Sequence, residues 1–176
     1  MLFNSLPFGL FFLTVLLLFY FVKKGGQTLV LLSASYLFYA FWSPTFLLLI
    51  LSSTLIDFYC GKAMSNRKKE NRLVFLLLSL LTNLGLLFYF KYQCFFLNDI
   101  CYRLLGINGC YSPDCLWYLV LPVGISFYTF QTLSYSIDIY RGTIKAEQNF
   151  TTFALFVSFF PQLVAGPIER ASSLLP

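Results

Sequence analysis

The sequence predicts an all-α, multi-pass transmembrane protein. Of its 176 residues, 59% are hydrophobic and only 11% are charged, whereas about a quarter of the residues of a soluble domain are charged. The mean hydropathy of the whole chain is +0.76. The apolar residues also gather in long runs separated by short basic or turn-rich gaps. A helix needs about 20 mostly apolar residues to cross the hydrocarbon core of a bilayer, and several of these runs approach that length.

Six apolar runs are interpreted as membrane helices: Leu6–Val22, Thr28–Trp42, Thr45–Cys60, Leu73–Tyr92, Leu116–Tyr140 and Phe150–Val164. The second run reaches only about 22 Å at 1.5 Å per residue, so a partial or interfacial helix is an alternative to a crossing there. The sixth run is predicted to end at Gly166-Pro167, because proline cannot continue a helix. A pore-lining elbow and an ordinary exit loop are both consistent with that ending.

The basic residues predict the orientation. If every run crosses, the gaps at 23–27, 61–72 and 141–149 share one face of the membrane. They hold nine of the twelve Lys and Arg: Lys23, Lys24, Lys62, Arg67, Lys68, Lys69, Arg72, Arg141 and Lys145. Cytoplasmic loops carry the excess of positive charge, so the N-terminus and residues 94–115 are expected outside. Because these charges sit between apolar runs, they indicate topology and lipid contact rather than a nucleic-acid surface.

Histidine is absent from the sequence, which removes the commonest general base and the commonest metal ligand. Five cysteines are present, but no CxxC pair occurs, so no metal site is expected. Cys101, Cys110 and Cys115 fall in the gap assigned to the outside. Both a disulfide between Cys110 and Cys115 and a role as small, semi-buried residues stay open there.

The third run contains an acid, Asp57, four residues after Ser53, so the two side chains share a helix face. A mid-helix Asp costs about 2.5–3.5 kcal/mol on insertion scales. Asp57 lies near the cytoplasmic end of its run, where this cost is smaller. It is therefore either an interfacial residue or a buried acid that is paired within a helix bundle.

The fifth run has a polar stripe with helical spacing, made of Tyr128, Gln131, Tyr135, Asp138 and Gly142. A second, apolar stripe contains Phe130, Leu133, Ile137 and Tyr140. In a lipid environment the polar stripe is expected to face partner helices or a wet cavity. Asp138 and Arg141 are three residues apart, so they are expected to pair at the cytoplasmic end. A structural seam and a substrate cavity explain the stripe equally well.

Five stretches together resemble one family, the membrane-bound O-acyltransferases, and most closely the bacterial branch that contains the alginate O-acetylation membrane protein. They occur in the family's order: LLSASYLFYAFW (31–42), SSTLIDFYCG (52–61), TNLGLLFYFKY (82–92), LPVGISFYTFQTLSYSIDIYRG (121–142) and FFPQLVAGPIER (159–170). The last two are long and specific, and the resemblance covers almost the whole chain.

The resemblance implies that residues 1–176 are the N-terminal part of one membrane-embedded acyltransferase domain, an incomplete piece of a larger helical pore. The family's essential histidine lies in the C-terminal half, so no catalytic residue can be assigned here, and the chain alone is expected to be inactive. The family motif positions are expected to be scaffold or pore lining: Gln131, Tyr135, Asp138, Arg141, Gln162, Gly166, Pro167, Glu169 and Arg170.

The implied activity passes an acyl group, usually acetyl, across the bacterial inner membrane to hydroxyls of an extracytoplasmic polysaccharide. No bound cofactor is expected. The resemblance implies acetyl-CoA or an acyl carrier as donor, the lipid bilayer as surroundings and an extracytoplasmic acetylation protein as partner. Two other function classes stay open from the residues alone. One is a small multi-span transporter or channel, since a polar stripe also describes an ion path, and the other is a structural membrane subunit.

Overall fold

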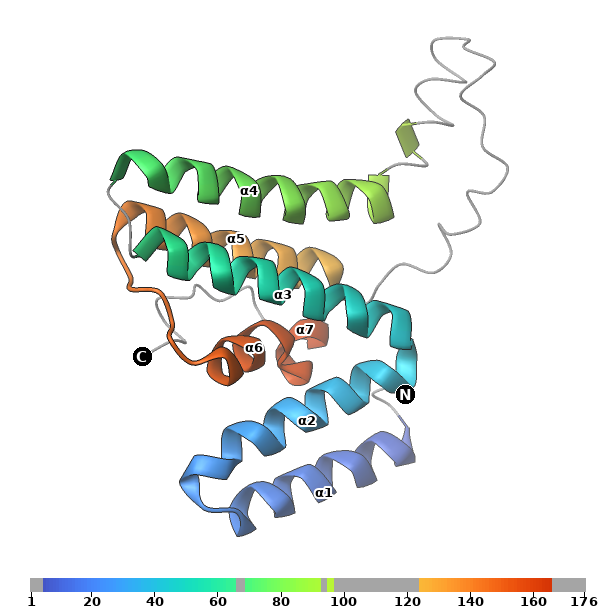
Figure 1. Cartoon of the computed structure of the whole chain (residues 1–176). Coiled ribbons are helices and arrows are strands. Elements are labelled where there is room, and N and C mark those ends of the chain that lie inside the picture. The colour runs from blue at the N-terminus through green and yellow to red at the C-terminus, as the bar shows by residue number, and fades with distance from the viewer. Residues whose placement is uncertain (1–4, 66–68, 93–94, 97–123, 166–176) are drawn as a thin grey trace.

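The computed structural model describes residues 5–65, 69–92, 95–96 and 124–165. The elements of the described part are all helices, as the sequence predicts (Figure 1). Its elements are α1 (Leu6–Phe21), α2 (Lys24–Trp42), α3 (Pro44–Ser65), α4 (Lys69–Leu87), the one-turn π-helix η1 (Phe88–Tyr92), α5 (Ile125–Arg141), α6 (Phe150–Ser158) and α7 (Phe160–Ala165).

The first four helices overlap the first four predicted runs, with bounds that differ by up to five residues at either end. Helix α2 is longer than its apolar run because it begins at Lys24 and includes two glycines. Its 19 residues reach about 28 Å, so its length no longer argues against a crossing. Two stretches, Pro44–Ser65 and Asn71–Tyr92, are long and apolar enough to span a bilayer, whereas Leu6–Phe21 and Phe150–Gln162 are apolar but shorter.

The helices form two groups with α6 and α7 between them (Figure 1). Helices α3, α4 and α5 pack against one another, and α1 packs against α2 as an antiparallel pair. Helix α6 contacts α2 on one side and α3 and α5 on the other, so it joins the two groups. The larger apolar core lies among α3, α4, α5 and α6, and a smaller one lies around Val15, Phe38 and Phe160.

The outer faces of α1 and α4 are apolar and exposed. On α4 they include Leu73, Val74, Leu77, Leu78, Leu81 and Leu84, and on α1 they include Leu10, Leu13, Leu16, Leu17 and Leu18. Exposed apolar surface of this extent marks contact with another apolar phase. These faces therefore suit the hydrocarbon of a membrane, which agrees with the predicted fold class.

The sixth run does not form the single helix that was predicted for Phe150–Val164. Helix α6 ends at Ser158, Phe159 leaves helical geometry with φ −59° and ψ 105°, and α7 begins at Phe160. The physical reason is Pro161, which has no N–H for the carbonyl of Val157 and whose ring would collide with the preceding turn. The predicted end at Gly166-Pro167 lies outside the described residues, as do residues 116–123 of the fifth run.

Helices α3 and α5 lie close together at Gly61, where a Cβ atom would lie 2.8 Å from Cε1 of Tyr135 and 3.1 Å from Cδ1 of Ile139. The Tyr135 ring cannot move aside easily. It is fully buried, it lies 4.5 Å from the ring of Phe153, and its hydroxyl accepts a hydrogen bond from the backbone N–H of Glu147.

Gly61→Ala is therefore expected to destabilise the bundle by about 1–3 kcal/mol, the usual cost of an overpacked core. Gly85→Ala in α4 is the matched control, because nothing lies within 4 Å of a Cβ at that position. It should be neutral or stabilise by about 0.5–1 kcal/mol through helix propensity. Thermal unfolding of the purified protein measures both effects, and equal stability of the two variants would contradict the close approach.

Candidate functional site

Asp57 lies at the centre of a polar network inside the bundle. Its carboxylate on α3 is fully buried and accepts hydrogen bonds from two side chains of α4. Ser79 Oγ donates to Oδ1 at 2.6 Å, and Asn83 Nδ2 lies 2.8 Å from Oδ1 and 2.9 Å from Oδ2. Of the two alternatives for Asp57, the structure therefore selects the buried, partnered acid. The partners are neutral donors rather than a cation.

Helix α5 extends this network with two hydroxyls. Ser136 Oγ lies 2.8 Å from Ser79 Oγ, and Thr132 Oγ1 donates to Asn83 Oδ1 at 3.2 Å. The side-chain amide of Asn83 therefore bonds two partners: its NH2 group donates to the carboxylate, and its oxygen accepts from Thr132. All of these side chains are at most 1% exposed. We call the five residues Asp57, Ser79, Asn83, Thr132 and Ser136 the Asp57 network.

The Asp57 network joins three helices through side chains alone. Buried polar groups cost free energy unless each has a partner, and here every member has at least one. Oriented donors can also stabilise negative charge on a buried carboxylate. The network can therefore fix the relative positions of α3, α4 and α5 and can hold a charged or a neutral acid.

Gln131 supports a different feature, the interruption between α6 and α7. Its side-chain Nε2 donates to the backbone carbonyl of Phe156 at 2.8 Å. In an unbroken helix that carbonyl would accept from the N–H of Phe160. Here the N–H of Phe160 instead donates to Ser35 Oγ of α2 at 3.4 Å. Two side chains from different helices thus replace one backbone hydrogen bond, and together we call them the α6–α7 clamp.

The polar stripe predicted on the fifth run faces protein for most of its length. Tyr128, Gln131 and Tyr135 are at most 3% exposed, while Asp138 is half-buried and Gly142 is exposed at the C-terminal end of α5. The hydroxyl of Tyr128 is buried without a hydrogen-bond partner, as is that of Tyr39 on α2. The apolar stripe is less uniform, because Phe130 is 48% exposed whereas Leu133 is buried.

The predicted ion pair between Asp138 and Arg141 is wrong for the described chain, in which no salt bridge joins them within 4.0 Å. Arg141 is the last residue of α5, and it is exposed. The adjacent turn is closed by the backbone instead, since the N–H groups of Gly142 and Thr143 donate to the carbonyls of Ile139 and Asp138.

The remaining candidates lie partly beyond the description. Gln162 is half-buried in α7, and Gly166, Pro167, Glu169 and Arg170 lie outside the described residues. Cys94, Cys101, Cys110 and Cys115 also lie outside them, whereas Cys60 is buried and free. No group of three or more His, Cys, Asp and Glu gathers within the described ranges. The roles of the motif residues as scaffold or pore lining stay predictions.

Sequence reasoning missed four members of the Asp57 network: Ser79, Asn83, Thr132 and Ser136. A signal was present for them. Ser79 and Asn83 are spaced i, i+4, and Ser126, Thr129, Thr132 and Ser136 form a second helical series on α5. Ser126 is at the opposite end of this series from Ser136, and its Oγ accepts a hydrogen bond from Lys91 Nζ at 3.2 Å. Ser and Thr side chains readily form hydrogen bonds to the backbone of their own helix, so the sequence alone does not show whether they contact another helix.

Comparisons with known proteins bear on the whole chain. It is 38% identical over 178 residues to the probable alginate O-acetylase AlgI of Pseudomonas aeruginosa, and the match covers 99% of this chain and 34% of that protein. The identity to AlgI of Pseudomonas syringae pv. tomato is 39%, with the same coverage. The chain is a partial-length homologue of the AlgI-type membrane-bound O-acyltransferases. The resemblance inferred from the five sequence stretches is thereby confirmed.

A more distant match extends the AlgI-type relationship to a second polymer. The peptidoglycan O-acetyltransferase of Helicobacter pylori is 30% identical over 214 residues, which cover all of this chain and 38% of that protein. The chain spans about a third of the length of its AlgI relatives. No protein-family model matches the sequence, and no solved structure matches it.

The AlgI-type homology covers nearly every residue described above, so the Asp57 network and the α6–α7 clamp both lie within it. Together with the apolar outer faces of α1 and α4, it identifies the chain as part of a membrane protein.

Proposed function

We propose that this chain forms part of the wall of a membrane O-acetyltransferase that passes an acetyl group to hydroxyls of an extracytoplasmic polysaccharide. The observation that carries the proposal is the homology over 99% of the chain to alginate O-acetylases. The homology to a peptidoglycan O-acetyltransferase supports the same reaction on a different glycan. An ion path is not favoured, because the members of the Asp57 network bond one another.

Within this function the chain positions helices rather than performing the chemistry. Transfer to a hydroxyl usually requires a base that removes its proton. The 176 residues contain no histidine, and the described cysteine that could act as a nucleophile, Cys60, is buried. We therefore assign the base to the part of the AlgI relatives that this chain does not match. The acetyl donor is acetyl-CoA or an acyl carrier on the cytoplasmic side, and a separate extracytoplasmic protein completes the transfer.

A chimera tests the proposal. Residues 1–176 replace the homologous third of Pseudomonas aeruginosa AlgI, and the chimera is expressed in a strain that lacks its own AlgI. We expect O-acetyl groups to reappear on the secreted alginate, measured by infrared or NMR spectroscopy. A chimera that inserts into the membrane in normal amounts but restores no acetylation would contradict the proposal.

Residues 1–176 expressed without the remainder are expected to give no acetylation in the same strain. The loss of a general base usually lowers the rate by about 10²–10⁴-fold, and this chain matches only about a third of the relatives' length. Acetylated polysaccharide above the background of the empty strain would show that the base lies within the chain.

The orientation is a separate prediction. We propose that the chain lies in the inner membrane, with the link between α5 and α6 in the cytoplasm and the link between α2 and α3 outside it. The reason for this orientation is that the gaps at 23–27, 61–72 and 141–149 carry nine of the twelve Lys and Arg. In a cysteine-free background, Ser43→Cys should react with a membrane-impermeant maleimide in cells with a permeable outer membrane. Lys145→Cys should react only after lysis, and the opposite result would invert the topology.

A further inference from the structure

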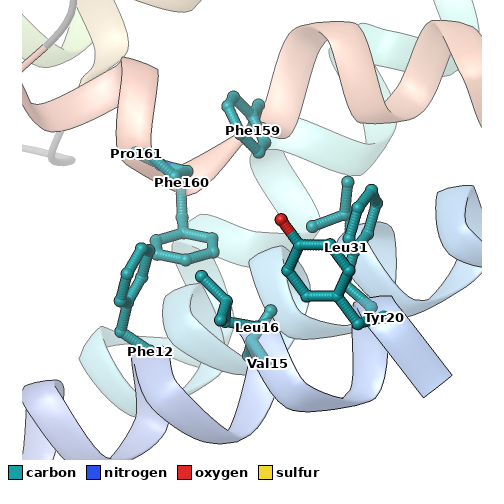
Figure 2. A pocket seen from close by; sticks show the side chains of 9 residues that line it. Phe12, Val15, Leu16, Tyr20, Leu31, Phe159, Phe160 and Pro161 are labelled. Carbon is teal, nitrogen blue, oxygen red and sulfur yellow. The ribbon is translucent and has the colours of Figure 1, made fainter.

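An apolar groove of about 220 Å³ lies where α1, α2 and the interruption between α6 and α7 meet (Figure 2). Figure 2 shows side chains from all of these elements around it, with Phe12, Leu16 and Tyr20 on one side and Phe159, Phe160 and Pro161 on the other. The groove depends on the helix interruption, because Phe159 leaves helical geometry there and the α6–α7 segment turns away from α1.

The groove has a closed floor and an open mouth. Phe160 and Val15 at its base are 1% and 7% exposed, whereas Leu16 and Tyr20 at its rim are 40% and 75% exposed. The rim continues into the apolar outer face of α1. In a membrane protein such a mouth opens to hydrocarbon rather than to water, and an apolar cavity does not hold water. The natural occupant of the groove is therefore a hydrocarbon chain.

Polar residues follow one another along the chain at the end of α1, where it turns into α2. Tyr20 contributes a hydroxyl (Figure 2), and Lys23, three residues further along, is exposed. The connection is held in place by Gln27, whose Nε2 donates to the carbonyl of Phe19 at 3.1 Å. Tyrosine favours the membrane interface, and lysine beside it attracts anionic headgroups.

The order of these features matches the order of groups in a phospholipid: a hydrocarbon chain, ester oxygens and a phosphate. We propose that the groove binds one acyl chain of an anionic phospholipid, with the ester region at Tyr20 and the phosphate at Lys23. The groove is lined by α1, α2 and the α6–α7 interruption, whereas the Asp57 network joins α3, α4 and α5. Lipid binding here does not depend on the acetyltransferase activity.

The test uses the AlgI chimera that carries residues 1–176, reconstituted in nanodiscs of phosphatidylcholine with phosphatidylglycerol. Native mass spectrometry after gentle release counts the lipids that stay bound. We expect one retained phosphatidylglycerol in the unmodified protein. Leu16→Trp fills the groove and should abolish retention. Leu13→Trp is the matched control, because Leu13 is on the same helix and 54% exposed but does not line the groove.

Lys23→Gln tests the headgroup contact without disturbing the packing, since Lys23 is exposed. It should reduce the preference for phosphatidylglycerol over phosphatidylcholine by about fivefold, the effect of one lysine near an anionic surface. Equal retention in Leu16→Trp and Leu13→Trp, or no preference between the two lipids in the unmodified protein, would overturn the proposal. The proposal would also be overturned if the unmodified protein retained no lipid and a crosslinker at Leu16→Cys captured another segment of the protein.

Discussion

Asp57→Ala is expected to lower the free energy of unfolding by about 1–3 kcal/mol for each buried donor that it leaves without an acceptor. The NH2 group of Asn83 loses both carboxylate oxygens and keeps the backbone carbonyl of Ser79 at 3.0 Å. The hydroxyl of Ser79 loses its short bond to Oδ1 but keeps Ser136. Most of the cost therefore falls on Asn83. Equilibrium unfolding of the purified protein in mixed micelles measures the loss.

Ser52→Ala is the matched control on the same helix, because the Ser52 hydroxyl is exposed and bonds only the carbonyl of Leu49. It should change stability by no more than about 0.5 kcal/mol. A combined variant with Asp57→Leu, Ser79→Ala, Asn83→Leu and Ser136→Ala should recover part of the loss, because replacing both partners of a buried hydrogen bond is nearly neutral. If Asp57→Ala is as stable as Ser52→Ala, the network contributes nothing to stability.

The second large effect is expected for Gln131→Leu. Leucine has a similar size but no donor, so the carbonyl of Phe156 would be left buried without its side-chain partner. We expect a loss of about 1–3 kcal/mol and, in the AlgI chimera, reduced alginate acetylation in proportion to the protein that stays folded. Gln148→Leu is the control, because Gln148 is exposed and its amide bonds only the nearby carbonyl of Ala146.

A double variant separates the clamp from ordinary packing at Gln131. Pro161→Ala restores an N–H for the carbonyl of Val157 and allows α6 to continue through Phe159, so that Phe160 can bond Phe156 in the usual way. In that background Gln131→Leu should cost at most about 0.5 kcal/mol. If Gln131→Leu lowers the free energy of unfolding equally with Pro161 and with alanine at position 161, Gln131 acts through packing alone, since independent effects add.

The helices were predictable because a strong physical constraint produces them. Lipid leaves no water to satisfy the backbone, so every crossing segment must be helical, and the apolar runs locate those segments within a few residues. The beginning of α2 was missed, since Lys24 and two glycines are poor members of an apolar run. The interruption before Pro161 was also missed, although the proline was visible, because the prediction placed the stop at the next proline, Pro167.

The candidate site was predictable only in part. The helical spacing of Tyr128, Gln131 and Tyr135 correctly indicated a face turned toward protein. It could not indicate that Gln131 bonds a backbone carbonyl of α6, because that contact joins residues 25 positions apart. The donors to Asp57 could not be predicted either, since Ser79 and Asn83 are uncharged and leave no pattern of opposite charges in the sequence. Asp138 and Arg141 did have a charge pattern and still form no ion pair in the described structure, where Arg141 is exposed.

The spacing of the Asp57 network along the chain bears on how the protein enters the membrane during synthesis. The two donors to the carboxylate follow it by 22 and 26 residues, and both belong to the very next helix. An α3–α4 hairpin that leaves the translocon as a unit can therefore shield its own acid before α5 has been made. Ser136 and Thr132 then add to a pair that is already satisfied, so the acid need never face lipid alone.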